Sequence, residues 1–122
     1  MGNANDLAKA ESHYYTALDL FASGDAEAAI AEFEASIVAD PTFMDARHGL
    51  SRALQETGNI DRAIEEATAI ANLDSDDVLS HTSLSILYQI KGMIAEAEAE
   101  SAKARILGWK YQLKEQKKNF ET

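Results

Sequence analysis

The sequence predicts an all-α protein, an α-solenoid in which pairs of helices stack one after another. Gly24, Gly58 and Gly92 are equally spaced along the chain, and each stands between two runs whose apolar residues recur at helical spacing. The same step links small residues at two further positions: Ala17, Ser51 and Ser85, and Ala29, Ala63 and Ala97. A fixed period of this length, carried by small residues, is typical of an array of helix–turn–helix units.

Start and stop signals lie next to the apolar stripes. Gly24 suits the left-handed residue that follows a helix, and Asp25 can then cap the next helix. Pro41 cannot continue a helix but is tolerated in a first turn, so the chain is expected to break there. We therefore expect helices at about 6–22, 26–39, 43–56, 60–73, 78–91, 94–107 and 109–120.

The last segment, 109–120, has the pattern of a terminal capping helix. Trp109, Leu113 and Phe120 fall on one side of a helix, and most of the remaining residues are polar or basic. An apolar face turned inward and a wet face turned outward would close the array. Gly108 leaves open whether this helix is separate from the preceding one or continuous with it, because a helical glycine costs only about 1 kcal/mol.

Length and composition limit the class of protein. With 122 residues the chain is expected to form a single domain, 1–122. It contains one Pro and no Cys, which excludes a disulfide framework, a thiolate metal site and a cysteine nucleophile. Neither a start typical of a signal peptide nor a run of apolar residues long enough to span a membrane is present. We therefore expect a cytoplasmic protein that does not enter a membrane.

The net charge of −10 is unevenly distributed. Residues 1–102 carry five basic and 19 acidic side chains, which gives −14, whereas residues 103–122 carry six basic and two acidic side chains, which gives +4. The acidic body argues against nucleic acid as a partner, because phosphates need a basic surface. Solubility alone accounts for such a charge. The basic tail also favours docking on an acidic surface, including that of a second copy.

Candidate catalytic and metal-ligating residues are few. The three histidines, His13, His48 and His81, include no pair at the i, i+4 spacing of a helical metal site, and we expect His13 and His81 to be packing residues. The acidic cluster at 74–77 lacks the glycine and the bidentate glutamate of a calcium loop, so we interpret it as a helix cap. The sequence therefore predicts a non-enzyme, with no catalytic residues, no metal ion and no cofactor.

Aligned as 10–43, 44–77 and 78–111, the three units resemble the tetratricopeptide repeat (TPR) family, and the chain is similar to short bacterial proteins of that family. The family has a small residue at its eighth position, glycine at its fifteenth and alanine at its twentieth, and all three units comply. Its eleventh position is large and apolar, as in Leu20, Leu54 and Tyr88. At the twenty-fourth position, where the family has an aromatic residue, Phe33 complies, whereas Ala67 and Ser101 do not.

The resemblance implies a concave groove, lined by the first helix of each repeat, that binds a partner. The groove residues carried over by position that we single out are Tyr14, Leu18, Phe21, His48, Arg52, Gln55, Leu79, Thr82, Ile86, Gln89 and Ile90. Some members of the family hold the carboxylate at the end of a chaperone tail with Lys, Asn and Arg. Those residue types are missing here, because the matching positions hold Tyr14, Leu18, Gly49, Leu79 and Ser83.

Two functions remain open at this point. In the first, the chain is a non-catalytic protein–protein interaction module, an adaptor or assembly factor whose groove binds a segment of a larger complex through aliphatic anchors, with an acidic group near Arg52. In the second, it is a structural homodimer whose groove or basic C-terminal helix engages a second copy. A third interpretation is that the apolar groove residues pack against the N-terminal segment or their own neighbours and form no binding surface.

Overall fold

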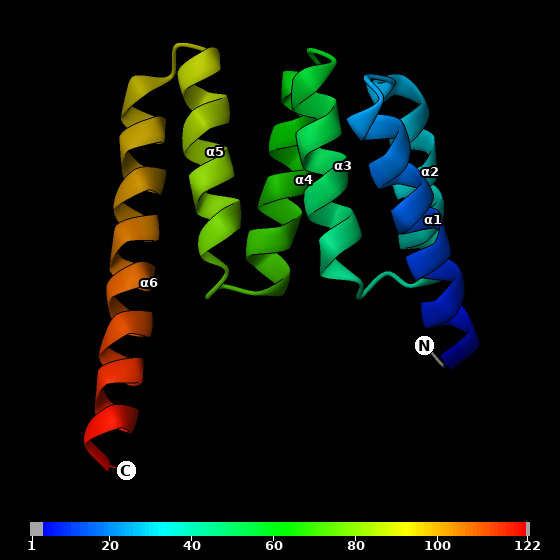
Figure 1. Cartoon of the computed structure of the whole chain (residues 1–122). Helices are drawn as coiled ribbons and strands as arrows, with labels where there is room; N and C mark the ends of the chain where they lie inside the picture. The colour runs from blue at the N-terminus through cyan, green and yellow to red at the C-terminus, as the bar shows by residue number, and fades with distance from the viewer. Residues whose placement is uncertain (1–3, 122) are drawn as a thin grey trace.

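A computed structural model describes residues 4–121 of the chain, and within this range it contains six α-helices and no strand. The helices are α1 (Ala4–Ala22), α2 (Ala26–Ala39), α3 (Met44–Glu56), α4 (Ile60–Leu73), α5 (Val78–Ile90) and α6 (Ile94–Glu121). Each packs mainly against the next helix in the sequence, so that the helices form a single array from α1 at one end to α6 at the other (Figure 1). This arrangement confirms the predicted all-α solenoid of three helix pairs.

The three turns within the helix pairs have the same geometry. Gly24, Gly58 and Gly92 have φ angles of 91°, 82° and 76°, in the left-handed region that side chains disfavour. The residue after each glycine donates its N–H to the carbonyl oxygen five residues earlier, as in the bond from Asp25 to Leu20 at 2.9 Å. This is the Schellman termination of a helix, and it explains why the glycine recurs with the period of the array.

The core runs along the array, both within and between the helix pairs, and is made mainly of alanine and leucine around one large ring. Phe33 on α2 is 1 % exposed and packs directly over Gly49 on α3, where an added Cβ would overlap the ring. In the next repeat Ala67 and Ser83 stand at the matching positions, and Ala67 is fully buried. The Phe33–Gly49 contact of one repeat is therefore replaced by the two smaller residues Ala67 and Ser83 in the next. This replacement explains why the second repeat needs no aromatic residue at position 67.

The C-terminal segment differs from the capping helix that the sequence predicts. Helix α6 runs through Gly108 without a break, so that 109–120 is its second half and not a separate helix. Trp109 is 72 % exposed and Phe120 is 91 % exposed, and neither side chain turns inward. The reason is length: α5 has 13 residues and α6 has 28, so the second half of α6 extends past the other helices (Figure 1). The Trp109 ring therefore does not fill space in the core.

Candidate protein-binding surfaces

The residues predicted to line the groove lie on α1, α3 and α5, and their exposure is unequal. The open part is on α5, where Leu79, Ile86 and Ile90 are 53 %, 43 % and 53 % exposed. These three residues are spaced seven and four apart, so they share one face of the helix. Thr82 and Gln89 are also exposed and border this stripe. Helix α5 thus presents an aliphatic face to solvent.

The aromatic residues predicted on α1 are instead partly built into the fold. The Tyr14 ring makes an edge contact with Phe43, with the ring centroids 5.2 Å apart, and lies 6.1 Å from Phe33. Tyr14 and Phe21 both pack against the main core cluster and are half-buried. Burial, reinforced by the nearby carboxylate of Asp45, raises the pKa of the Tyr14 phenol, which stays neutral at pH 7. On α1 only Leu18, among the predicted residues, is exposed.

The basic residues predicted at the centre of the groove are already matched by acidic ones. His48 Nε2 lies 3.0 Å from Asp77 Oδ2, in the turn before α5, and both side chains are less than one-fifth exposed. Arg52 Nε donates to Glu56 Oε1 at 3.3 Å, one turn further along α3. Gln55 is half-buried beside them. The centre of this surface is therefore polar, with a carboxylate beside each of its two basic side chains, whereas the α5 side of it is apolar.

Two histidine–glutamate pairs join helices in a way that was not predicted from the sequence. His13 Nδ1 lies 2.7 Å from Glu32 Oε2, and His81 Nδ1 lies 2.6 Å from Glu100 Oε2. Each pair connects the two helices of one repeat, α1 with α2 and α5 with α6. The equal sequence separation of the two pairs, in the first and third repeats, is the signal that would have revealed them. These histidines therefore act as polar links between the two helices of a repeat.

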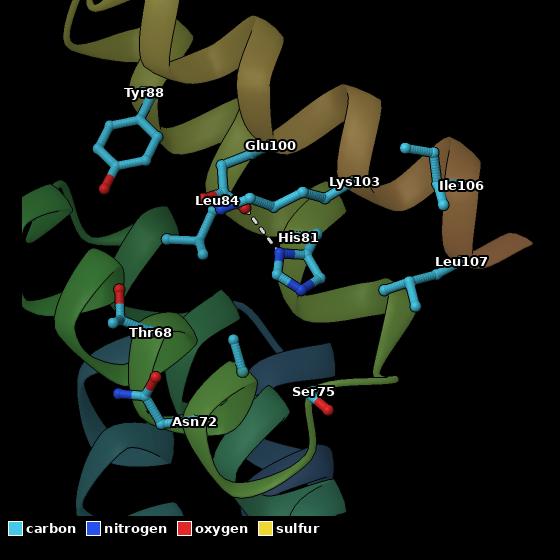
Figure 2. Close-up of a pocket in the computed structure, with 11 residues that line it drawn as sticks. Thr68, Asn72, Ser75, His81, Leu84, Tyr88, Glu100, Lys103, Ile106 and Leu107 are labelled. Carbon is cyan, nitrogen blue, oxygen red and sulfur yellow. Dashed lines mark hydrogen bonds and ion pairs between the residues drawn. The ribbon is translucent and has the colours of Figure 1, made fainter.

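A pocket of about 480 Å³ lies between α4, α5 and α6, with the His81–Glu100 pair in its wall (Figure 2). The same hollow occurs one repeat earlier, between α2, α3 and α4, with a volume of about 250 Å³. Ile37 lines the smaller pocket, whereas Ala71 stands at the matching position, one period later, in the larger one. The larger pocket is thus a gap of the repeat itself, widened by smaller side chains, and its buried polar groups bond to each other.

Within residues 4–121, no three His, Asp or Glu side chains lie close enough together to hold a metal ion. Over the same range, no helix is both long enough and apolar enough to cross a membrane. The described chain instead exposes large apolar side chains on two helices, α5 and α6.

Fold and repeat period together define the protein as a helical-repeat solenoid. A family model described as tetratricopeptide repeat matches residues 20–85, more than half of the sequence, and the chain belongs to the tetratricopeptide repeat family. No curated protein sequence is significantly similar to the chain.

Several solved structures share the fold. MamA is 24 % identical with a TM-score of 0.82, over 85 % of this chain and 61 % of MamA, so the chain spans about three-fifths of that protein. The Yersinia enterocolitica type III secretion chaperone SycD, in complex with a peptide of the translocator YopD, is 28 % identical with a TM-score of 0.79. That match covers 86 % of this chain and 80 % of SycD. An alternative dimer of SycD is 27 % identical with a TM-score of 0.81, over 96 % of this chain and 89 % of SycD.

Proposed function

We propose that the chain is a protein-interaction module, an adaptor or assembly factor that binds a segment of another protein on the surface formed by α1, α3 and α5. The observation that carries the proposal is the aliphatic stripe of Leu79, Ile86 and Ile90, which is open to solvent. Contiguous apolar surface on a folded protein usually marks a site of protein contact. The similarity to SycD, which was solved with a peptide of its translocator, supports the same kind of role.

The partner segment is defined by the chemistry of this surface. Aliphatic side chains on α5 fit aliphatic anchors on the partner, spaced along a helix or an extended peptide. Because Asp77 and Glu56 already match His48 and Arg52, the centre of the surface offers no unbalanced positive charge for an acidic anchor. The acidic body disfavours a strongly acidic partner as well. We therefore infer a segment that is apolar at its anchors and neutral or basic between them.

This role requires no catalysis, cofactor or metal ion, and the chain is proposed to act as a non-enzyme. A cytoplasmic location remains a prediction from the cysteine-free sequence, which suits a reducing compartment.

A selection from a displayed library of random peptides tests the proposal directly, because it does not require the natural partner to be identified first. Peptides that bind the purified chain are expected to share two or more spaced aliphatic residues. The Ile86→Glu variant is expected to lower their affinity by about 100-fold or more, because a charge would face the apolar anchors. Val38→Glu is the matched control, since Val38 is 82 % exposed on α2, outside the proposed surface. Peptides that bind wild type and Ile86→Glu equally would contradict the proposal.

A further inference from the structure

Helix α6 carries an apolar stripe that no part of the described chain covers. In its first half the stripe is made of Ala95, Ala99 and Ala102, of which the first two are exposed. In its second half the large side chains are Ile106, Trp109, Leu113 and Phe120, all at least 54 % exposed. From Ala95 to Leu113 these residues follow one another at alternating steps of four and three. Phe120 comes seven residues after Leu113, with the polar Gln116 between them, and all lie on one side of the helix over about 37 Å.

The stripe is not a requirement of the repeat. Helix α4 occupies the matching place one repeat earlier, and its residues there are polar: Asp61, Glu65, Thr68 and Asn72. In α6 the same four positions hold three alanines and Ile106. The outward face that is wet on α4 is therefore apolar on α6, although both helices are the second of their pair.

Most of the second half of α6 has no neighbour that accounts for its being a helix. Lys110, Tyr111 and Lys114 border a small pocket with Asp76 and Val78, and beyond Lys114 the helix extends alone from the array (Figure 1). Isolated helices of about 12 to 15 residues are marginal in water, and an interior glycine weakens them by about 1 kcal/mol. A helix of this length that carries Trp109 and Phe120 on its surface is expected to be stabilised by a partner.

We propose that this partner is α6 of a second copy, packed antiparallel on the stripe. The pairing has its two-fold axis midway between Ile106 and Trp109, so that Ile106 of each copy faces Trp109 of the other. Moving outward, Leu113 of one copy then faces Ala102 of the other. At the ends of the pair, Phe120 faces Ala95. Each large side chain beyond the centre meets an alanine, which is the size complementarity that close helix packing requires.

The distribution of charge along α6 also favours the antiparallel orientation. The first part of α6, residues 94–100, carries three acidic and no basic side chains, which gives −3. Its second part, residues 103–121, carries six basic and two acidic side chains, which gives +4. Antiparallel pairing places each basic part beside the acidic part of the other copy, whereas parallel pairing places like charges together. Near the centre Lys103 and Lys110 do approach each other, and Lys103 Nζ is held 3.2 Å from Glu100 within its own chain.

The rest of the protein leaves room for this pairing. Ala97 is buried against the array, and Ile106 follows it by nine residues, or two and a half helical turns. Most of the stripe therefore lies on the side of α6 that points away from the body, and Ile106 stands at its edge, where it also lines the pocket between α4, α5 and α6. Each body packs on the first half of its own α6, so in the pair the two bodies lie at opposite ends. The surface of α5 proposed to bind a partner segment stays open, and the two proposals are independent.

The mass of the full chain in solution, measured by light scattering over a dilution series, tests the pairing. We expect a mass of twice the chain mass of 13.3 kDa at high concentration. Ala102→Glu together with Leu113→Glu is expected to raise the dissociation constant by about 100-fold or more, because the two glutamates face each other across the pair and bury like charges there. Thr68 on α4 stands at the position that matches Ala102 and is exposed, so the array accepts a polar side chain at this place. Ile86→Glu is the matched control and is expected to leave the mass unchanged.

Single cysteines in this cysteine-free chain report the orientation. A mixture of the Ala102→Cys and Leu113→Cys chains is expected to form a disulfide-linked dimer on mild oxidation, because these two positions face each other across the pair. Ala102→Cys alone is not expected to do so, because its two copies lie about three helical turns apart along the pair. A monomeric mass at every concentration would overturn the proposal. So would a dimer that survives the double glutamate substitution, or rapid cross-linking of Ala102→Cys with itself.

Discussion

His81 Nδ1 lies 2.6 Å from Glu100 Oε2, and this bond joins the two helices of the last repeat. The side chains of His81 and Glu100 are only 11 % and 14 % exposed. The corresponding pair in the first repeat, His13 and Glu32, is 45 % and 31 % exposed. The same polar link thus occurs in two environments, one shielded from water and one partly open to it.

This difference predicts unequal effects of the same substitution. His81→Ala leaves the shielded carboxylate of Glu100 without its closest partner and is expected to lower the free energy of unfolding by about 1–3 kcal/mol. His13→Ala breaks a more exposed pair and is expected to cost less than about 1 kcal/mol. Urea denaturation of the two variants measures both values. Equal losses would show that the shielding of the His81 pair is unimportant.

Two glycines inside helices are predicted to respond in opposite directions to alanine. At Gly49 the added Cβ would overlap the Phe33 ring, and overpacking of this kind costs about 1–3 kcal/mol, so we expect destabilisation despite the better helix former. At Gly108 nothing lies within 4 Å of the added Cβ, and Gly108→Ala is expected to stabilise α6 by about 0.5–1 kcal/mol. Urea denaturation together with far-ultraviolet circular dichroism measures both. A stabilised Gly49→Ala variant would contradict the close packing of the ring.

Asp40 gives the protein a predictable loss of stability in acid. Thr42 donates both its hydroxyl and its backbone N–H to Asp40 Oδ1, at 2.6 Å and 3.0 Å, and the bond from the hydroxyl contributes most to a pKa of Asp40 below its ordinary value of 3.8. A lowered folded-state pKa means that the stabilisation is present above 3.8 and is lost as the pH falls through the folded-state value.

The Asp40→Asn variant isolates this contribution, because it retains an acceptor oxygen but cannot titrate. We expect wild type to exceed the variant in free energy of unfolding near neutral pH, and the difference to shrink as the pH is lowered below 3.8. Urea denaturation at a series of pH values measures it. A difference that stays constant across the series would show that the carboxylate is not stabilised by Thr42.

Trp109 is predicted to matter for association and not for the folding of one chain. A buried tryptophan costs about 3–5 kcal/mol when truncated to alanine, whereas the 72 % exposure of Trp109 predicts a loss of less than about 1 kcal/mol in dilute, monomeric protein. Denaturation at low concentration and light scattering at high concentration separate the two effects of Trp109→Ala. A loss of about 3 kcal/mol in the monomer would mean that the ring packs against its own chain.

The repeat period predicted the fold well, because it reflects a local physical need. Close crossing of two helices requires small residues such as Ala29, and each tight turn requires a residue such as Gly24 with positive φ. That residues 109–120 continue α6 and leave Trp109 exposed could not be predicted in the same way. Gly108 is a weak breaker, and no proline or cap follows it. Whether the Trp109 ring is covered depends on which other parts of the fold reach it in space. The sequence of α6 alone carries no information about those neighbours.

In the candidate binding surface, too, local features could be predicted from the sequence and long-range contacts could not. Exposure of Ile86 on α5 follows from helical spacing, which is a local property. The partner of Arg52 could also have been found, because Glu56 lies four residues away on the same helix. The partner of His48 could not, because Asp77 is brought to it by the stacking of α3 against the turn before α5. The sequence therefore predicted His48 as a groove residue but not the carboxylate of Asp77 that lies beside it.

Binding of a partner segment on the surface formed by α1, α3 and α5 is tested most directly by nuclear magnetic resonance. The methyl-labelled chain is titrated with a selected peptide, and the methyl signals are followed one by one. We predict that the signals of Leu79, Ile86 and Ile90 shift on binding, while those of Val38 on α2 do not. Shifts confined to Val38 and other residues of α2 and α4, with the α5 methyl groups unchanged, would contradict the account.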